Sequence, residues 1–189
     1  ILKPIVGANY EVGVKGELMD GKLNTSFALY RIDQKNRAVQ DYEAGPVCNG
    51  GYCSRAAGKV RSQGFETEMS GELMRGLQLA AGYTFNSNRY LSDPDREGQT
   101  FSEETPRHLL RLWSEYRLPG QLNRLSVGAG VNWQSALTNS ISKVRRPSYS
   151  VWNTRVAYDV TSNWTAALNV NNLFDKVYYE YPGYVENRN

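Results

Sequence analysis

The feature that most restricts the fold of this chain is a sequence period of two. In residues 124–134 every second side chain is apolar, and the positions between them are polar or Gly. The apolar set is Leu125, Val127, Ala129, Val131 and Trp133, and the other set is Arg124, Ser126, Gly128, Gly130, Asn132 and Gln134. Because successive side chains of a β-strand point to opposite faces, this pattern predicts a strand with one apolar and one polar face.

The same period occurs in eight segments, which we predict to be strands. They are residues 6–18, 23–33, 59–73, 77–86, 105–118, 124–134, 147–160 and 164–171. Two apolar phases compete in 23–33, which suggests a bulge, and Leu109 and Trp113 are apolar exceptions on the polar face of 105–118. Short turns rich in Gly, Asp, Pro or Asn alternate with three long polar connections, 34–58, 88–104 and 135–146.

The length of the strands and the alternation of short and long connections favour a transmembrane β-barrel. Strands of about 12 residues can cross a bilayer at a tilt, whereas strands of soluble proteins usually have about five or six residues. Glu66, Glu68 and Glu72 share one face and could not lie unpaired in a dry core. We therefore expect the apolar faces to contact lipid and the polar faces to line the lumen. No apolar run approaches the roughly 20 residues of a spanning helix, so a helical membrane protein is excluded.

The pattern alone leaves two other all-β folds open. One is a complete eight-stranded outer-membrane barrel with a structural or adhesive role, in which the last strand pairs with the first. The other is a soluble β-barrel that binds a small apolar ligand, which would leave Glu66, Glu68, Arg111 and Arg117 in solvent.

Charge and residue usage argue against several classes of function. The 22 basic and 19 acidic residues give a net charge of +3 and are scattered, which gives no case for nucleic-acid binding. The single histidine, His108, has no nucleophile motif near it, so we predict that the protein is not an enzyme and has no catalytic residue.

Cys48 and Cys53 are the two cysteines, and they lie in a Gly-rich stretch. A metal site would need further Cys or His ligands nearby, and His108 is distant in the sequence. We therefore favour a disulfide at the tip of the connection 34–58, which is typical of an oxidising compartment, and predict no metal site.

Five motifs resemble, in the same order, those of TonB-dependent outer-membrane siderophore receptors. They are Leu2-x-Pro4-x-x-Gly7-x-Asn9-Tyr10-Glu11-x-Gly13-x-Lys15, the strand 27–37, Gly64-Phe65-Glu66-x-Glu68, Thr105-Pro106-Arg107-His108 and Asn171-Asn172-Leu173-Phe174-Asp175. Within that family, the cysteine pair followed by Ser54-Arg55-Ala56 and Gly58 is similar to ferripyoverdine and ferric-coprogen receptors.

The resemblance implies that residues 1–189 are the C-terminal portion of a receptor barrel in the bacterial outer membrane. Such barrels have roughly 22 antiparallel strands, of which about eight would lie in this chain. The family's N-terminal plug domain, its TonB box and its closing strand are expected to lie outside these residues.

The function that the resemblance implies is the uptake of a ferric siderophore, driven by TonB. The ligand is recognised as a whole chelate, so no cofactor is expected. The implied partners are the ferric siderophore, the TonB–ExbB–ExbD complex acting through the plug and TonB box, and outer-membrane lipid and lipopolysaccharide.

Aromatic and arginine side chains on the loops and upper strand ends are the candidate ligand contacts, because they combine flat apolar surface with positive charge. They are Tyr42, Tyr52, Arg89, Tyr90, Arg145, Arg146 and Tyr149. A solvated loop or an aromatic interface girdle is the alternative interpretation for each of them.

Overall fold

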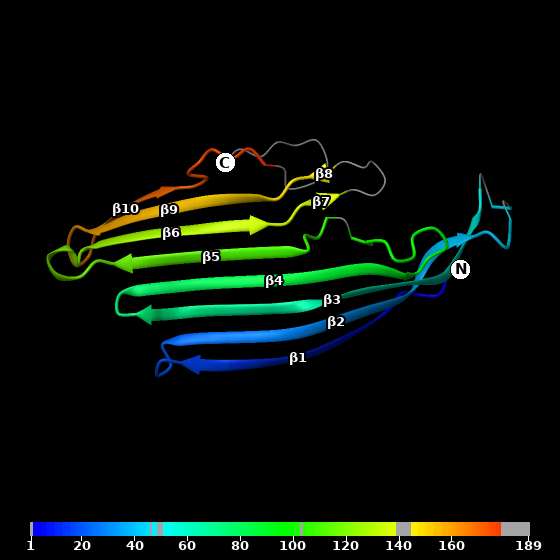
Figure 1. The fold of residues 1–189 in the computed structure, drawn as a ribbon, viewed down its shortest axis with the longest axis horizontal. Coiled ribbons are helices and arrows are strands. Elements are labelled where there is room, and N and C mark those ends of the chain that lie inside the picture. Colours follow the sequence, from blue (N-terminus) through cyan, green and yellow to red (C-terminus); the bar gives the residue numbers. More distant parts are fainter. Residues whose placement is uncertain (1, 46, 49–50, 103, 139–144, 179–189) are drawn as a thin grey trace.

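The computed structural model describes residues 2–45, 47–48, 51–102, 104–138 and 145–178. These residues form one eight-stranded antiparallel sheet in the order β1-β2-β3-β4-β5-β6-β9-β10 (Figure 1). The strands are β1 (Val6–Leu18), β2 (Leu23–Asp41), β3 (Cys53–Met74), β4 (Leu77–Ser92), β5 (His108–Arg117), β6 (Leu125–Gln134), β9 (Tyr149–Asp159) and β10 (Thr165–Val170). The remaining elements are the short 3₁₀ helix η1 (Gly120–Leu122) and a separate ribbon of β7 (Leu137–Thr138) with β8 (Arg145–Arg146).

The first long connection is shorter than predicted, because most of it is strand. β2 continues to Asp41 and β3 begins at Cys53, so much of 34–58 belongs to a paired hairpin. β4 likewise continues to Ser92. These extensions mix polar and apolar residues without a period of two, so they lack the alternation that marks a strand in the sequence. Backbone pairing with the neighbouring strand extends them all the same.

The bulge suggested for 23–33 lies further along the chain. The pairing of β2 with β3 is continuous as far as Gln34 and shifts between Gln34 and Arg37, where Asn36 has a positive φ of 63°. Packing against a glycine explains part of the second apolar phase of β2. Tyr30 lies on the polar face and packs over Gly64 of β3, since a Cβ added at Gly64 would lie 2.9 Å from the Tyr30 hydroxyl oxygen.

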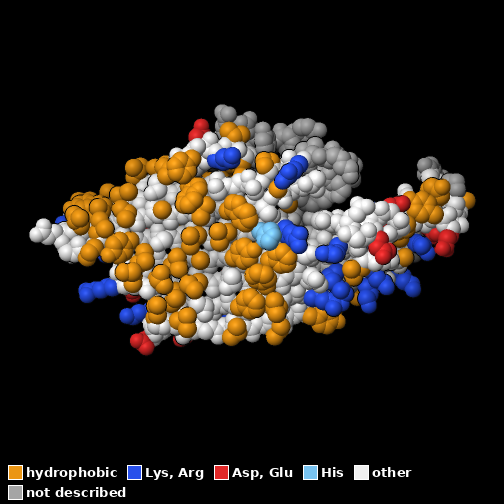
Figure 2. Space-filling model, viewed as in Figure 1, with side chains coloured by type: hydrophobic (Ala, Val, Ile, Leu, Met, Phe, Trp, Pro, Cys, Tyr) orange, Lys and Arg blue, Asp and Glu red, His pale blue; other side chains and the backbone are white. Residues whose placement is uncertain are grey.

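The register of the sheet separates two chemically different faces. One row across neighbouring strands contains Val12, Leu29, Phe65, Phe85 and His108. A row on the other side contains Lys15, Ser26, Glu68, Gly82, Arg111 and Asn132. We call these sides the apolar face and the polar face. Figure 2 shows the apolar face, with hydrophobic side chains spread over most of the sheet.

Trp113, which the sequence places on the polar face, covers two glycines of the neighbouring strand. An added Cβ would lie 2.8 Å from the indole at Gly128 and 2.5 Å from it at Gly130. The ring therefore fills the space that side chains on β6 would otherwise occupy. This packing explains both the apolar exception on β5 and the glycines that alternate with apolar residues on β6.

The sheet leaves apolar side chains uncovered by protein. Val12, Val14, Leu168 and Phe174 each expose more than 60% of their surface. Side chains of this kind on the outer face of a transmembrane barrel contact lipid. No helix in the described ranges has the length and apolar character that a membrane crossing requires.

The sheet is open at both sides. Within the described residues β1 pairs only with β2, and β10 pairs only with β9. A complete eight-stranded barrel would need the first and last strands to pair. The described residues therefore do not support that alternative, and they do not form a closed soluble barrel either.

Candidate ligand-binding site at the loop end of the sheet

The long and the short connections lie at opposite ends of the sheet (Figure 1). The described residues of the β2–β3 tip and the segments 93–102, 104–107, 135–138 and 145–148 lie at one end, which we call the loop end. In transmembrane barrels with this asymmetry, the longer loops face the outside of the cell. A ligand arriving from outside therefore meets the loop end first.

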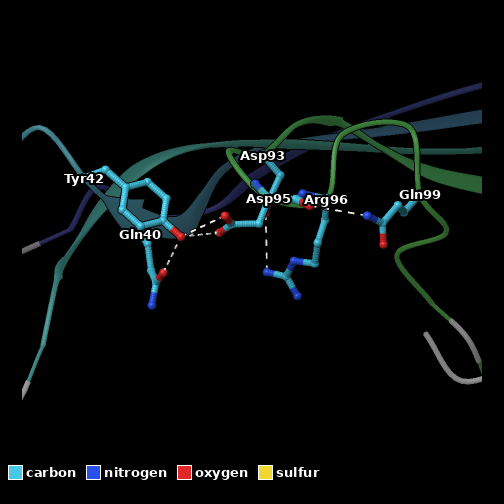
Figure 3. A network of polar contacts seen from close by, with 6 residues as sticks. All are labelled: Gln40, Tyr42, Asp93, Asp95, Arg96 and Gln99. Carbon is cyan, nitrogen blue, oxygen red and sulfur yellow. Dashed lines mark hydrogen bonds and ion pairs between the residues drawn. The ribbon is translucent and has the colours of Figure 1, made fainter. Parts of the chain in front are cut away.

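Tyr42 joins two of the long connections (Figure 3). Its hydroxyl oxygen lies 2.8 Å from each carboxylate oxygen of Asp95, in the segment between β4 and β5, and 2.7 Å from Oε1 of Gln40. The hydrogen bond to the Asp95 carboxylate raises the pKa of Tyr42 above its usual value of 10.0. The hairpin tip and the next loop are thus held together while this hydroxyl keeps its proton.

The loop that carries Asp95 is folded onto the end of β4. The carboxylate of Asp93 accepts hydrogen bonds of 3.1 Å from the backbone N–H groups of Asp95 and Arg96, and one of 3.3 Å from the Arg96 side chain (Figure 3). The Arg96 guanidinium carbon lies 4.7 Å from the centre of the Tyr90 ring. Tyr90 is buried and also packs edge-on against Phe101. This predicted ligand residue therefore holds the loop in place.

The predicted disulfide between Cys48 and Cys53 is confirmed. Beside it, the rings of Tyr42 and Tyr52 meet edge to face, with their centres 4.9 Å apart. Both tyrosines are partly exposed. The two predicted ligand residues of the first connection thus lie together at its tip.

A second group of predicted residues lies beyond β6. Arg145 and Arg146 form β8, and the Arg146 guanidinium lies 5.6 Å from the centre of the Tyr149 ring. Tyr149 stacks on Tyr178, with the ring centres 4.6 Å apart and the planes 28° apart. Arg146, Tyr149 and Tyr178 therefore form one cationic and aromatic group.

Tyr149 and Tyr178 also line a hollow of about 660 Å³, mostly on the polar face. Its other lining residues are Glu104, Leu109, Arg111, Asn132, Trp133, Gln134, Val151, Asn153, Asn171 and Asn172. Most of these side chains can donate or accept hydrogen bonds. The hollow can thus hold a large polar ligand without covalent chemistry.

The prediction of single ligand residues from the sequence missed most of this lining. Arg111, Asn132 and Asn153 lie within strands, whereas the candidates were chosen on loops and upper strand ends. The alternation places these residues on the polar face, which could have suggested a role in binding. The alternation does not show how close a residue lies to the loop end of the strand. Among the described residues, no group of three or more His, Cys, Asp or Glu could hold a metal ion.

Arg89 lies apart from the other predicted residues. It pairs in register with Arg61, which pairs with Asp33, and this row belongs to the same side of the sheet as Phe65 and Phe85. The structure therefore places Arg89 on the same side of the sheet as the apolar face, whereas its neighbour Tyr90 points to the other side.

The fold and the loop end define one wall segment of a transmembrane β-barrel with a polar lumen and a loop-lined mouth. Comparison with known families supports the same conclusion, because the model of the TonB dependent receptor-like β-barrel family matches residues 1–173. The chain therefore belongs to the β-barrel family of TonB-dependent receptors, which are proteins of the bacterial outer membrane.

Similar proteins in this family are siderophore receptors. The ferric-pyoverdine M114 receptor of Pseudomonas sp. (strain M114) is 47% identical over 94% of this chain and 22% of its own length. The ferripyoverdine receptor of Pseudomonas aeruginosa is 36% identical over 97% of this chain and 23% of its own length. A crystal structure of the latter receptor bound to ferripyoverdine matches with a TM-score of 0.79 and 35% identity, over 96% of this chain and 25% of that one. The chain thus spans about a quarter or less of these relatives.

Proposed function

We propose that this chain forms part of the wall and mouth of an outer-membrane receptor that takes up a ferric siderophore of the pyoverdine class. The observation that carries the proposal is the 47% identity to a ferric-pyoverdine receptor over 94% of the chain. The matched stretch includes all three long connections and the polar hollow, which are the parts of this chain that a ligand from outside would meet.

The chemistry of the loop end suits a ferric chelate. The siderophore supplies the oxygen or nitrogen ligands of the iron, so the protein has to recognise only the outer surface of the complex. Stacked Tyr149 and Tyr178 offer flat apolar contact, and Arg111 offers a positive charge with several hydrogen-bond donors. The asparagines and Gln134 of the hollow can both donate and accept hydrogen bonds.

We infer that the energy for uptake comes from the inner membrane. In this mechanism the TonB–ExbB–ExbD complex acts on a plug domain inside the barrel and thereby opens a path for the bound chelate. The polar face of this sheet would form part of the lumen in which the plug sits. Its charged rows, such as Glu68 beside Arg111 across Gly82, are suited to a hydrated contact of that kind.

Iron uptake by the receptor that contains this chain tests the proposal. We would express the receptor in a strain without its own siderophore receptors and measure uptake of radioactive iron supplied as ferripyoverdines, ferrioxamine B or a ferric catecholate. We expect uptake from one or more ferripyoverdines, dependent on TonB. Uptake from none of the ferripyoverdines, with normal amounts of receptor in the outer membrane, would contradict the pyoverdine assignment.

A pair of tyrosines on β9 tests the site. Tyr149→Ala removes a ring that lines the hollow, and Tyr158→Ala is the control, since Tyr158 lies on the apolar face and is 47% exposed. We expect Tyr149→Ala to weaken binding of the transported chelate at least about fivefold, which is the threshold of a significant interface contact. Equal effects of the two variants on binding would contradict the assignment of the hollow to the ligand-binding site.

A further inference from the structure

The polar hollow carries one charge of each sign, and the two charges lie at different depths. Among the described residues that line the hollow, Glu104 is the only acid and Arg111 the only base. Glu104 lies in the connection between β4 and β5, at the loop end of the sheet (Figure 1). Arg111 lies within β5, three residues after the strand begins at His108, which is about 10 Å along the strand. The negative charge is therefore at the rim of the hollow, and the positive charge is deeper in its wall.

Both charges are available to a ligand. Within the described residues, neither Glu104 nor Arg111 takes part in an ion pair or a side-chain hydrogen bond, and both are exposed. Glu68 lies in the same row as Arg111, but Gly82 lies between them. At the usual spacing of strands, Glu68 is thus about 10 Å from Arg111 across the sheet. The side chain beside Arg111 on β6 is the neutral amide of Asn132.

This arrangement suits a ligand with a positive group at one end and a negative group at the other. The iron-binding oxygens of a ferric siderophore are deprotonated, so the chelate end is rich in negative charge. A guanidinium such as that of Arg111 donates paired N–H groups to oxygens of this kind. An aliphatic amine elsewhere in the siderophore is protonated at neutral pH and would be attracted by the carboxylate of Glu104.

We propose that Glu104 selects ferric chelates that carry an amine or guanidinium group away from the iron. Together with Arg111 it orients the bound molecule, with the iron end inward and the cationic end at the rim. The proposal rests on the proposed function, because it takes the hollow as the ligand site, and it adds a charge that the ligand must carry. Attraction between exposed charges is modest, so Glu104 determines which chelate is preferred and supplies only a small part of the affinity.

The test uses two pairs of chelates that differ only in one positive charge. The first pair is a ferripyoverdine with a free side-chain amine and the same chelate acetylated at that amine. The second pair is ferrioxamine B, which has a terminal amine, and its N-acetyl derivative. Equilibrium binding of each radioactive iron chelate to the purified full-length receptor gives the affinities. The variants are E104Q and R111Q, and E97Q is the control, because Glu97 is exposed in the same connection and does not line the hollow.

We expect the receptor to prefer the free-amine form of each chelate over the acetylated form by about threefold to fivefold, which is the upper range for an exposed ion pair. E104Q should abolish this preference by weakening the binding of the free-amine form alone. R111Q should weaken the binding of both forms alike and keep the preference. E97Q should change neither affinity. The preference should also decrease as the salt concentration rises, since ions screen exposed charges. Heat-modifiable gel mobility should show that all variants fold.

Equal binding of the two forms by the unchanged receptor, or an unchanged preference in folded E104Q, would refute the selection by Glu104 and leave the pyoverdine assignment intact. The same loss of preference in E97Q would also refute it, because any acidic residue of the connection would then suffice. A preference lost in R111Q and kept in E104Q would refute the orientation. The expected preference with the ferrioxamine pair, in a receptor that binds no ferripyoverdine, would support the role of Glu104 and contradict the pyoverdine assignment. Binding of neither pair would contradict both proposals.

Discussion

The assignment of the two faces can be tested with neighbouring residues of β4. Ala81 lies on the apolar face, paired with Met69 and Leu112, and Gly82 lies on the polar face, paired with Glu68 and Arg111. We would replace each of them by arginine in the full-length receptor. An added Cβ at Gly82 meets no atom within 4 Å, so the second variant places its side chain in open space.

The expected magnitude follows from the depth of Ala81. It lies midway between Leu77, where β4 begins, and Phe85, about 13 Å along the strand from each. Phe85 packs near Phe65 and His108 in a row of aromatic side chains on the apolar face, and aromatic girdles of barrels lie at the interface between hydrocarbon and head groups. An arginine near the bilayer midplane costs about 2–4 kcal/mol, which is a change of about 30- to 900-fold in the folding equilibrium. Gly82→Arg should change the free energy of unfolding by less than about 1 kcal/mol, since its charge lies beside Glu68 in a hydrated lumen.

Urea unfolding of the receptor in phospholipid vesicles measures the free energy of unfolding of both variants. The amount of folded receptor in the outer membrane measures their assembly in cells. Equal losses in the two variants, or a larger loss for Gly82→Arg, would refute the face assignment. The neighbouring pair Gly128 and Ala129 is less suitable. An added Cβ at Gly128 would lie only 2.8 Å from the Trp113 ring, so steric strain would obscure the effect of charge.

Three further predictions concern local packing and the loops. Gly130→Ala should destabilise the barrel by about 1–3 kcal/mol, because its Cβ would lie 2.5 Å from the Trp113 ring and 2.6 Å from the Leu112 carbonyl oxygen. Gly82→Ala is the matched control, and equal unfolding midpoints of the two variants would contradict this packing. C48S/C53S should leave assembly of the barrel intact but loosen the β2–β3 hairpin tip, because the disulfide that closes so short a loop contributes on the order of 2 kcal/mol to its stability. The rate of proteolysis at the tip, with and without reductant, measures this loosening. An unchanged cleavage rate in the variant would contradict the prediction. The link between Tyr42 and Asp95 should persist at neutral pH and be lost only as the pH rises above 10.0, because the pKa of Tyr42 is raised and the protonated hydroxyl makes the bond. Absorbance titration of the receptor against Tyr42→Phe checks this, and the absence of a late-titrating tyrosine in the unchanged receptor would count against it.

The sequence was sufficient to predict the strands that cross the membrane and their two faces. The segments 6–18 and 124–134 contain β1 and β6 with little error, since lipid on one side and water on the other impose a period of two on the side chains. The family motifs span the chain and predicted the receptor family, which the match to residues 1–173 confirms. The disulfide could also be predicted, because its two cysteines are close in sequence and have no alternative partner.

Only the tertiary structure decided what lies above the membrane and which residues meet across strands. The outer parts of β2, β3 and β4 mix polar and apolar residues without a period of two, so no alternation marks them, and backbone pairing defines them. Trp113 covers Gly128 and Gly130 because the register of β5 and β6 brings these residues together. They are too far apart in the sequence for a local sequence pattern to predict this contact. The side of the sheet on which Arg89 lies also became clear only from the structure, whereas the sequence predicted Arg89 as a ligand contact beside Tyr90. Adjacent side chains of a strand point to opposite sides, and the register shows that Arg89 lies on the side of the sheet that carries Phe65 and Phe85.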